Sequence, residues 1–279
     1  MTLGHRDIVE PLLARLKAPL SEYVFSNLYL FRAIHEYRLA LEPIPHILGL
    51  TYDGMRHAMP LIPLDRSRLA RLLECAPCVY PIPEQALAAV LDESLYVHWN
   101  DADSDYVYPR QQLAELGGPV LKSRKRQAAS FEALAKPTVT ALDESNVCGA
   151  YTLLDLWAQQ VAPLNRQTDY AACREALDHF GSLQLSGMSV ADSDGRTCAF
   201  LLASRQGSDT AVVHFAKADR SLEGVYPYLF SRFAAGTGGA WLNFEQDLGK
   251  PGLRRAKRAL DPVRMLRKCR VSSRSGEVR

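Results

Sequence analysis

The chain has 279 residues, of which 47% are hydrophobic and 23% are charged, the composition of an ordinary globular protein. This balance excludes a disordered chain and a repetitive fibre, and no apolar run approaches the ~18 residues that span a bilayer. At roughly 100–200 residues per domain, the length predicts one large domain or two ordinary ones. Residues 1–10 lack the apolar stretch of a signal peptide, and six cysteines are too few for a disulfide scaffold, so we expect a cytoplasmic protein.

The net charge of +2 conceals an uneven distribution along the chain. Residues 250–279 contain eleven Lys or Arg against two acids, which gives this segment a charge of +9 and leaves −7 for the rest. Such an asymmetry favours a polyanionic partner, namely nucleic acid, anionic lipid or a phosphorylated cofactor. The alternative is a solvated basic segment, and we expect residues 271–279 to form a flexible basic tail.

The first half of the chain predicts short helices and strands in alternation. Helical spacing of apolar residues predicts helices at residues 6–17, 21–32, 65–75 and 83–91. Asp65 stands where it caps the third of these, and Pro83 stands where a first-turn proline is tolerated. Gly and Pro residues divide 45–64 into short strands and turns. Residues 105–127 predict an aromatic strand, a helix and a Gly-Gly turn, which a basic run follows.

The second half predicts an α+β unit of about 130 residues. Helices are expected at 147–161 and 168–180, followed by a three-stranded antiparallel meander at 183–191, 197–204 and 210–217. A helix at 222–235, a strand at 240–244 and a basic helix at 252–260 complete it. The polar stretch 136–146 predicts the boundary between an N-terminal domain, residues 1–137, and a C-terminal domain, residues 138–270.

Two short motifs are similar to known functional motifs, but the residues around them argue against a functional role. Cys75 and Cys78 have the C-x-x-C spacing of redox and zinc sites, but the prolines that follow prevent the helix a redox motif needs, so two small core residues are favoured. The Gly-Thr-Gly-Gly run at 236–239 follows a helix and precedes a strand, which indicates a helix stop rather than a phosphate loop. Arg232 misses the spacing of an acyl-CoA loop by one residue.

The end of the predicted strand 210–217 carries candidate site residues. Lys217 and Asp219 stand where a Lys neutralises a carboxylate or phosphate and an Asp holds an ammonium or acts as a base. A surface ion pair is the alternative. Alternation along this strand places His214 with Val212 and Ala216 on one face and Lys217 on the other, and a lone strand His is more often structural than catalytic.

The next strand ends in a second polar group. Asn243, Glu245 and Asp247 alternate there, so they share one side of the strand for as long as it lasts. Carboxylates in this position bind a substrate amine, and the basic helix that follows, with Lys257, binds phosphate. The alternative is a polar strand end with Asp247 as a helix cap.

Two long stretches resemble a known family, HFAKADRSLEGVYPYLF at 214–230 and WLNFEQDLGKPGLRRAKRALDPVRMLRK at 241–268. The family pattern is close to Asn-x-Glu-x-Asp-Leu-Gly, then Gly-Leu-Arg-x-Ala-Lys, then Pro-Val-Arg. The chain matches it at Asn243, Glu245, Asp247, Leu248, Gly249, Gly252, Leu253, Arg254, Ala256, Lys257, Pro262, Val263 and Arg264. The segments 21–32, 105–108 and 117–126 also fit. Over residues 20–270 the chain thus resembles the C-terminal catalytic domain of phosphatidylglycerol lysyltransferases and the soluble stand-alone relatives of that domain.

The resemblance implies an α+β fold of two tandem GNAT-like (N-acetyltransferase-like) folds, with mixed, largely antiparallel sheets flanked by helices. It implies that the second fold carries most of the site. It also implies a donor aminoacyl group carried by tRNA and no bound cofactor, and we predict no metal site. The acceptor stays open between a lipid, a peptide and a small molecule. The chain lacks the membrane flippase region of the family's membrane enzymes, and its basic run at 122–127 lacks the Asn and His often found there.

On this reading the site residues have distinct roles. Glu245 and Asp247, beside Asn243, hold the α-ammonium of the donor or activate the acceptor, and Lys217 and Asp219 line the same cleft. Phosphates of the tRNA 3′ end and acceptor arm contact basic residues, namely Lys257, Arg264, Arg254, Arg255, Arg258, Lys122, Arg124, Lys125 and Arg126. Two alternatives remain: an acyl-CoA-dependent N-acyltransferase of the same fold, and a non-catalytic protein that binds tRNA or makes peripheral contact with an anionic membrane.

Overall fold

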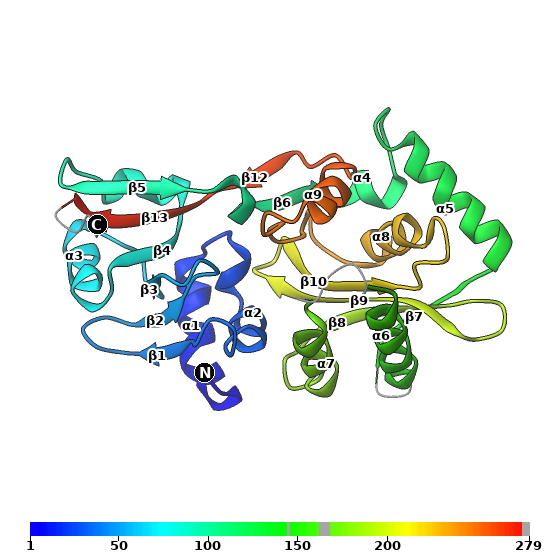
Figure 1. The fold of residues 1–279 in the computed structure, drawn as a ribbon, viewed down its shortest axis with the longest axis horizontal. Coiled ribbons are helices and arrows are strands. Elements are labelled where there is room, and N and C mark those ends of the chain that lie inside the picture. The colour runs from blue at the N-terminus through cyan, green and yellow to red at the C-terminus, as the bar shows by residue number, and fades with distance from the viewer. Residues whose placement is uncertain (144–145, 162–167, 275–279) are drawn as a thin grey trace. The chain divides into compact units, whose positions relative to one another are not determined.

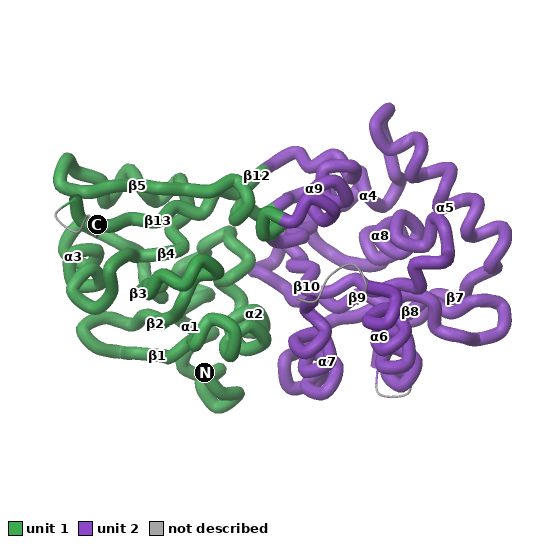
Figure 2. Tube along the Cα trace, viewed as in Figure 1, with its two compact units in different colours: residues 1–105, 246–249, 265–279 green, residues 106–245, 250–264 purple. Residues whose placement is uncertain are grey.

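The computed structural model describes residues 1–143, 146–161 and 168–274 (Figure 1). The chain divides into two compact units (Figure 2). Unit 1 consists of residues 1–105, 246–249 and 265–279, and unit 2 consists of residues 106–245 and 250–264. Each unit is built around one mixed β-sheet flanked by helices, as the sequence predicts.

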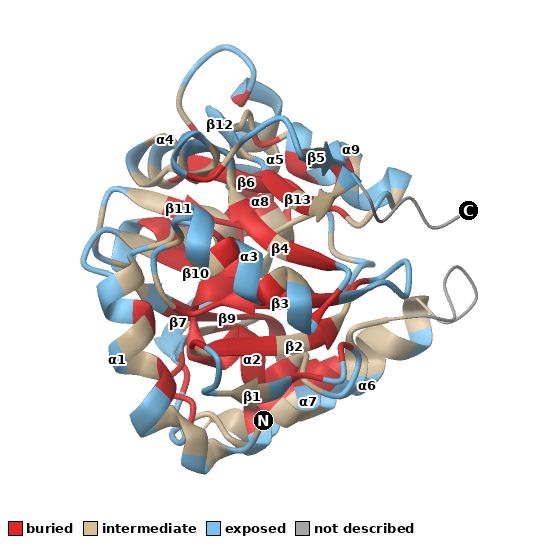
Figure 3. Ribbon diagram, turned by 90° about the vertical axis from the view of Figure 1, so that its left-hand side faces the viewer, coloured by how far each residue is buried: buried red, intermediate tan, exposed pale blue. Residues whose placement is uncertain are grey.

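Unit 1 contains a six-stranded sheet in the order β1-β2-β3-β4-β13-β5. Its strands are β1 (Arg38–Ala40), β2 (His46–Leu50), β3 (Arg56–Pro60), β4 (Cys78–Pro83), β5 (Leu95–Trp99) and β13 (Lys268–Ser273). Only β3 and β4 are parallel among these described pairs, and helix α3 (Arg66–Cys75) connects them. The unit also holds α1 (Arg6–Leu16), α2 (Phe25–Leu30) and 3₁₀ helices at Leu3–His5, Ser21–Tyr23, Glu84–Ala89 and Asp101–Asp103. Strands β2, β3, β4 and β13 are largely buried, whereas β5 and the outer faces of α1 and α3 are exposed (Figure 3).

Unit 2 contains a seven-stranded sheet in the order β12-β6-β11-β10-β9-β8-β7. Its strands are β6 (Asp105–Pro109), β7 (Thr138–Ala141), β8 (Ser186–Ala191), β9 (Thr197–Gln206), β10 (Thr210–Ala218), β11 (Trp241–Asn243) and β12 (Arg264–Leu266). β10 and β11 are parallel and are connected by α8 (Val225–Gly236), whereas β7 to β10 form antiparallel pairs, as do β11 and β6. The remaining helices are α4 (Arg110–Glu115), α5 (Lys122–Ala135), α6 (Val147–Val161), α7 (Tyr170–Asp178) and α9 (Pro251–Arg258).

Different helices cover the two faces of the unit 2 sheet. Leu201 and Ala203 of β9 belong to a buried cluster with Leu229 of α8, to which α4 and α5 also contribute. Alternate residues of a strand point to opposite faces, so Phe200 and Leu202 point to the other face. Helices α6 and α7 lie over that face, and α6 packs on β9 and β10 (Figure 1).

Most of the locally patterned elements occur where the sequence predicts them. Helix α3 begins after Asp65, whose carboxylate accepts a hydrogen bond from the Arg68 backbone N–H at 2.8 Å, and the β8–β9–β10 meander is confirmed. Helix α8 ends at Gly236, which confirms the helix stop. The predicted α-helix at 83–91 is wrong, because Pro83 ends β4 and residues 84–89 form a 3₁₀ helix.

The two sheets share one order of strands, and each borrows a strand from the other half of the chain. In both, an antiparallel meander is followed by a helix and a parallel strand, β4 in unit 1 and β11 in unit 2. The next strand in space is β13 for unit 1 and β6 for unit 2. Residues 106–137 are grouped with unit 2, because β6 pairs with β11. The polar stretch 136–146 contains β7, which pairs with β8 and is the last strand in the order of the sheet.

Candidate active site

Glu245 lies directly after β11 in a backbone conformation that its surroundings fix. The strand ends at Asn243, and Glu245 adopts a φ of +57°, in the left-handed region that residues with a side chain rarely occupy. Its backbone N–H donates to Asn243 Oδ1 at 2.8 Å, and its carbonyl oxygen accepts from the Tyr106 N–H at 3.1 Å. Such conformations persist where neighbouring groups hold them, and they cluster at functional sites.

The Glu245 side chain completes a chain of hydrogen bonds that the sequence does not predict. Its Oε1 lies 2.8 Å from His214 Nδ1, and His214 Nε2 lies 2.7 Å from Ser204 Oγ. The His214 side chain is completely buried, whereas 16% of the Glu245 side chain is exposed. A hydroxyl, an imidazole and a carboxylate are therefore in hydrogen-bonded order, and Glu245 is the member whose side chain is partly exposed.

A β-bulge in β10 changes the faces that strand alternation predicts for the residues after His214. The pairing of β10 with β9 shifts between Val213 and Phe215, so His214 is the extra residue. Val212 lies opposite Ser204, and Lys217 lies opposite Phe200, which puts Val212 and Lys217 on the same face of the sheet. The prediction that Val212 and Lys217 lie on opposite faces is therefore wrong.

Asp247 does not continue a row with Asn243 and Glu245. Because the strand ends at Asn243, the alternation that the sequence predicts ends there too. Asp247 is buried, and its Oδ1 accepts a hydrogen bond from the Gly249 N–H at 2.8 Å, inside a turn where Leu248 and Gly249 have positive φ. This contact makes Asp247 a residue that shapes the turn.

Lys257 is buried rather than presented to a phosphate. Its Nζ donates to the carbonyl oxygen of Phe244, and its own carbonyl oxygen accepts from the Tyr108 hydroxyl at 2.8 Å. The ammonium therefore supports the backbone next to Glu245. A contact between Lys257 and the tRNA 3′ end stays a prediction.

Lys217 and Asp219 are engaged with residues of α6 and α7 and the turns beside them. Lys217 Nζ lies 2.6 Å from Asp169 Oδ1 and 3.7 Å from the centroid of the Trp157 ring. Asp219 accepts hydrogen bonds at 2.7 Å from Gln160 Nε2 and from the Ser221 hydroxyl. Burial acts to raise the pKa of Asp219, but these hydrogen bonds outweigh it and lower that pKa below its usual value. A cleft shared with Glu245 stays a prediction.

The basic residues of unit 2 differ in exposure. Helix α9 exposes Arg255 and Arg258, whereas Arg254 is half-buried, and the exposed Arg264 guanidinium lies 4.1 Å from the centroid of the Trp241 ring. In the first turns of α5, Lys122, Lys125 and Arg126 are exposed, and the half-buried Arg124 donates to Gln127 at 2.9 Å. Both helices thus offer cations to solvent.

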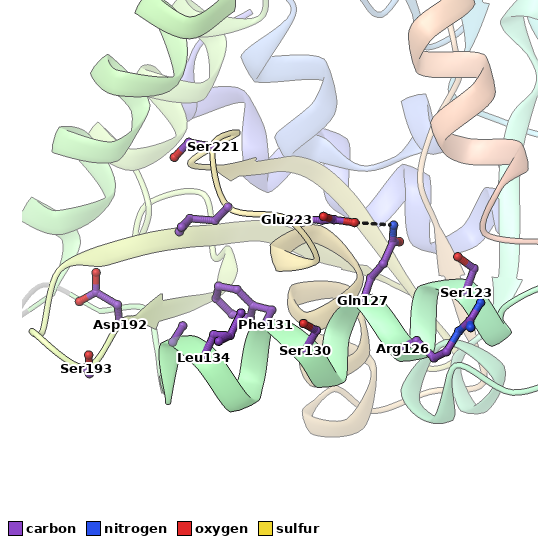
Figure 4. A pocket seen from close by; sticks show the side chains of 12 residues that line it. Ser123, Arg126, Gln127, Ser130, Phe131, Leu134, Asp192, Ser193, Ser221 and Glu223 are labelled. Atoms are coloured by element: carbon purple, nitrogen blue, oxygen red, sulfur yellow. Dashed lines mark hydrogen bonds between the residues drawn. The ribbon is translucent and has the colours of Figure 1, made fainter.

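A cavity of about 770 Å³ lies along α5 (Figure 4). Phe131 and Leu134 of α5 line it together with Asp192. Gln127 and Glu223 also line it, and the Gln127 side-chain amide donates a hydrogen bond to the Glu223 carboxylate at 3.3 Å. Of the predicted site residues, Arg126 alone is among those lining this cavity. This cavity is therefore distinct from the Glu245 site.

Unit 1 contains a buried charged cluster, which we call the Lys268 cluster, made of Lys268, Glu22, Asp105, Ser21 and Gln246. Lys268 Nζ lies 2.6 Å from Glu22 Oε1 and 2.6 Å from Asp105 Oδ1, and the side chains of Lys268 and Asp105 are completely buried. Ser21 donates its backbone N–H to Asp105 at 2.7 Å. Two carboxylates share one ammonium. The members of this cluster are far apart along the chain, so no local sequence pattern indicates it.

The Lys268 cluster predicts a pH dependence of stability. Burial raises the pKa of Glu22 from 4.5 to about 7, against the opposing effect of Lys268. Between these two values the folded protein binds one proton more than the unfolded chain, so a rise in pH through this range lowers the free energy of unfolding. Urea denaturation between about pH 5 and pH 8 is expected to show this decline in the wild type and a flatter profile in Glu22→Gln. Parallel profiles for the two proteins contradict the assignment to Glu22.

The cysteine pair does not form a reactive or metal-binding site in the described residues. Cys75 is exposed at the end of α3, and Cys78 is buried at the start of β4, where burial raises the pKa of its thiol to about 11. Among residues 1–143, 146–161 and 168–274, no three His, Cys, Asp or Glu side chains are grouped to hold a metal ion. Within the same ranges, none of the helices is long and apolar enough to cross a membrane.

Comparisons with known proteins agree with this architecture. Residues 13–270 match the family described as phosphatidylglycerol lysyltransferase, C-terminal. A protein of unknown function from Bacteroides thetaiotaomicron has a similar structure, with a TM-score of 0.85 and 24% identity over 98% of both chains. The C-terminal domain of a protein described as a lysylphosphatidylglycerol synthetase from Agrobacterium fabrum gives a TM-score of 0.66 at 13% identity, covering 97% of this chain and 92% of that one. L-PGS from Bacillus licheniformis gives 0.64 at 12% identity, covering 98% and 93%. No curated protein sequence matches significantly.

These likenesses confirm the predicted fold of mixed sheets flanked by helices. The family match covers both units and every residue of the predicted site. The chain therefore belongs to the phosphatidylglycerol lysyltransferase C-terminal family and is an acyltransferase.

Proposed function

We propose that this acyltransferase is tRNA-dependent and moves an aminoacyl group from aminoacyl-tRNA to a hydroxyl or amine acceptor. The observation that supports this best is the Glu245 carboxylate, which His214 holds through one oxygen while the side chain still reaches the surface. A fixed carboxylate suits an ammonium, because charge-assisted hydrogen bonds are the strong ones. The α-ammonium is the group that distinguishes an aminoacyl donor from a plain acyl donor.

The chemistry needs no covalent intermediate on the protein, because the aminoacyl ester of tRNA is already activated. The acceptor oxygen or nitrogen bonds to the ester carbonyl carbon, and the bond from that carbon to the ribose oxygen breaks. The proton that the acceptor loses ends on the ribose hydroxyl. The protein holds the two reactants in line and stabilises the tetrahedral oxyanion. In this scheme Glu245 holds the donor ammonium, and Asn243 and Asp247 keep the loop around it in shape.

The transfer reaction is tested with bulk tRNA charged with labelled amino acids. The protein is incubated with this tRNA and with lipid, peptide and small-molecule extracts in separate reactions. Loss of label from tRNA above the hydrolysis blank, with its appearance in one fraction, is the expected result, and that fraction identifies the acceptor class. Label that stays on tRNA in every reaction, together with transfer from a panel of acyl-CoA thioesters, overturns the proposed donor.

The exposed cations of α9 give a prediction for tRNA binding. Each Lys or Arg placed on a phosphate releases condensed counterions, which makes the affinity fall with salt. Replacing Arg255 and Arg258 by Ala is expected to reduce the magnitude of the slope of log K against log salt by about 1.5, at roughly 0.7–0.9 per contact. Binding is measured by filter retention of tRNA over a salt series.

The matched control removes two exposed arginines from unit 1, Arg15 and Arg71, and has the same change in net charge. Its salt slope is expected to equal that of the wild type. Equal slopes for all three proteins would show that α9 does not contact the tRNA backbone.

A further inference from the structure

Ser204, His214 and Glu245 form an ordered chain of hydrogen bonds whose consequence goes beyond the transfer reaction itself. We infer that Ser204 and His214 are positioning residues, which hold the Glu245 carboxylate where it binds the donor α-ammonium. The protein therefore takes donors with a free α-amine and discriminates against donors whose amine is blocked. The inference rests on the proposed function, and it names the substrate class of that site.

The donor and acceptor roles along this chain follow from chemistry. A carboxylate only accepts, so the proton on the side facing Glu245 is on His214 Nδ1. In a neutral imidazole Nε2 then carries a lone pair, and the Ser204 hydroxyl donates to it at 2.7 Å. The carboxylate thus fixes the imidazole tautomer, and the hydroxyl holds the ring in the orientation that donates to Glu245 at 2.8 Å. Groups behind a binding residue commonly set its orientation in this way.

Burial determines which member of the chain meets the substrate. Ser204 and His214 are both buried, and Ser204 lies within β9. Glu245 alone of the three has a side chain that is not buried. Ser204 and His214 therefore act through Glu245 and do not themselves contact the donor.

The backbone adds a second restraint on the carboxylate. Asn243 and Tyr106 hold the Glu245 backbone from both sides, while His214 holds its side chain. A charged group that is already immobile loses little freedom when it binds, so it discriminates well between an ammonium and a neutral amide. N-acetylation replaces the donor ammonium with a neutral amide and so removes this charge-assisted hydrogen bond, for which about a 10- to 100-fold preference for the free amine is expected.

The test compares transfer from aminoacyl-tRNA with transfer from its N-acetylated form. The wild type is expected to favour the free amine in kcat/KM by at least about 10-fold, and His214→Ala is expected to bring this ratio close to one. His214→Asn should restore part of the preference, because its amide N–H stands close to the position of Nδ1. Ser204→Ala should lower the ratio to an intermediate value. The control is Ser189→Ala, a buried serine on the neighbouring strand β8, whose ratio should match the wild type.

Two direct measurements keep the inference separate from the proposed function. Nitrogen-15 NMR of the His214 ring, assigned by the His214→Asn difference, should show the Nδ1–H tautomer in the wild type and a mixture of tautomers in Glu245→Ala, which lacks the carboxylate that requires it. Calorimetric titration should show tighter binding of 3′-aminoacylamino-adenosine, carrying lysine or alanine, than of its N-acetyl form. A wild type that transfers nothing but passes both measurements overturns the proposed function alone. An Nε2–H tautomer, or a transfer ratio that His214→Ala leaves unchanged, overturns the inference alone.

Discussion

Replacement of Lys268 by Met is expected to lower the free energy of unfolding by about 3–5 kcal/mol, the loss typical of a buried ion pair that keeps only one side. Glu22 and Asp105 lie 2.6 Å from the ammonium, and Asp105 is completely buried, so the variant leaves two carboxylates together without a cation. Urea denaturation followed by circular dichroism measures the loss. The exposed Lys125→Met on α5 is the matched control, and its change should stay within about 0.5 kcal/mol.

A triple variant separates the charge effect from the shape effect. Lys268→Met combined with Glu22→Gln and Asp105→Asn removes all three charges and leaves the volumes nearly unchanged. Replacing a whole buried ion cluster by neutral groups is far less costly than breaking it, so the triple variant should be more stable than Lys268→Met alone. If it is less stable, shape rather than charge governs this part of unit 1.

Glu245→Gln is expected to lower kcat/KM for aminoacyl transfer by about 10- to 100-fold, the loss of one hydrogen bond to a charged group. Glutamine keeps the length and one acceptor oxygen, so the contact with His214 Nδ1 at 2.8 Å can persist while the negative charge is lost. Steady-state transfer with the identified donor and acceptor gives the change. Because the side chain is partly exposed, the fold should tolerate this substitution.

The control for the Glu245 variant is Glu115→Gln, an exposed glutamate at the end of α4 that bonds to Gln111. It has the same change in charge and chemistry within unit 2 and should transfer at the wild-type rate. Wild-type activity in Glu245→Gln, with both proteins fully folded by circular dichroism, would remove Glu245 from the proposed site.

Local patterns in the sequence predict much of the fold. The helix after Asp65 follows from one capping carboxylate and the spacing of its apolar residues, and the β8–β9–β10 meander follows from apolar runs separated by turn residues. The helix expected at 83–91 fails because Pro83 belongs to β4, whose place is set by pairing with β13 near the other end of the chain. Propensity alone does not contain that pairing.

The candidate site depends on features of the same non-local kind. Glu245 is found by its family motif, but its contact with His214 joins two different strands, and a bulge that strict alternation does not include puts Lys217 on the face of Val212. Lys257 looks like a phosphate ligand in a basic helix, yet the long side chain reaches inward to the Phe244 carbonyl. A residue type and its spacing thus indicate which groups are present, whereas packing decides what they contact.

The borrowed strand of unit 1 has a consequence for how the protein is made. β13 lies between β4 and β5, although the ribosome synthesises both of these strands long before it. Until β13 emerges, the facing edges of β4 and β5 have no partner between them, and unpaired strand edges on a nascent chain invite wrong pairing. The first unit to be translated is therefore the last to be completed, and Lys268, which opens β13, arrives together with the strand that closes the sheet.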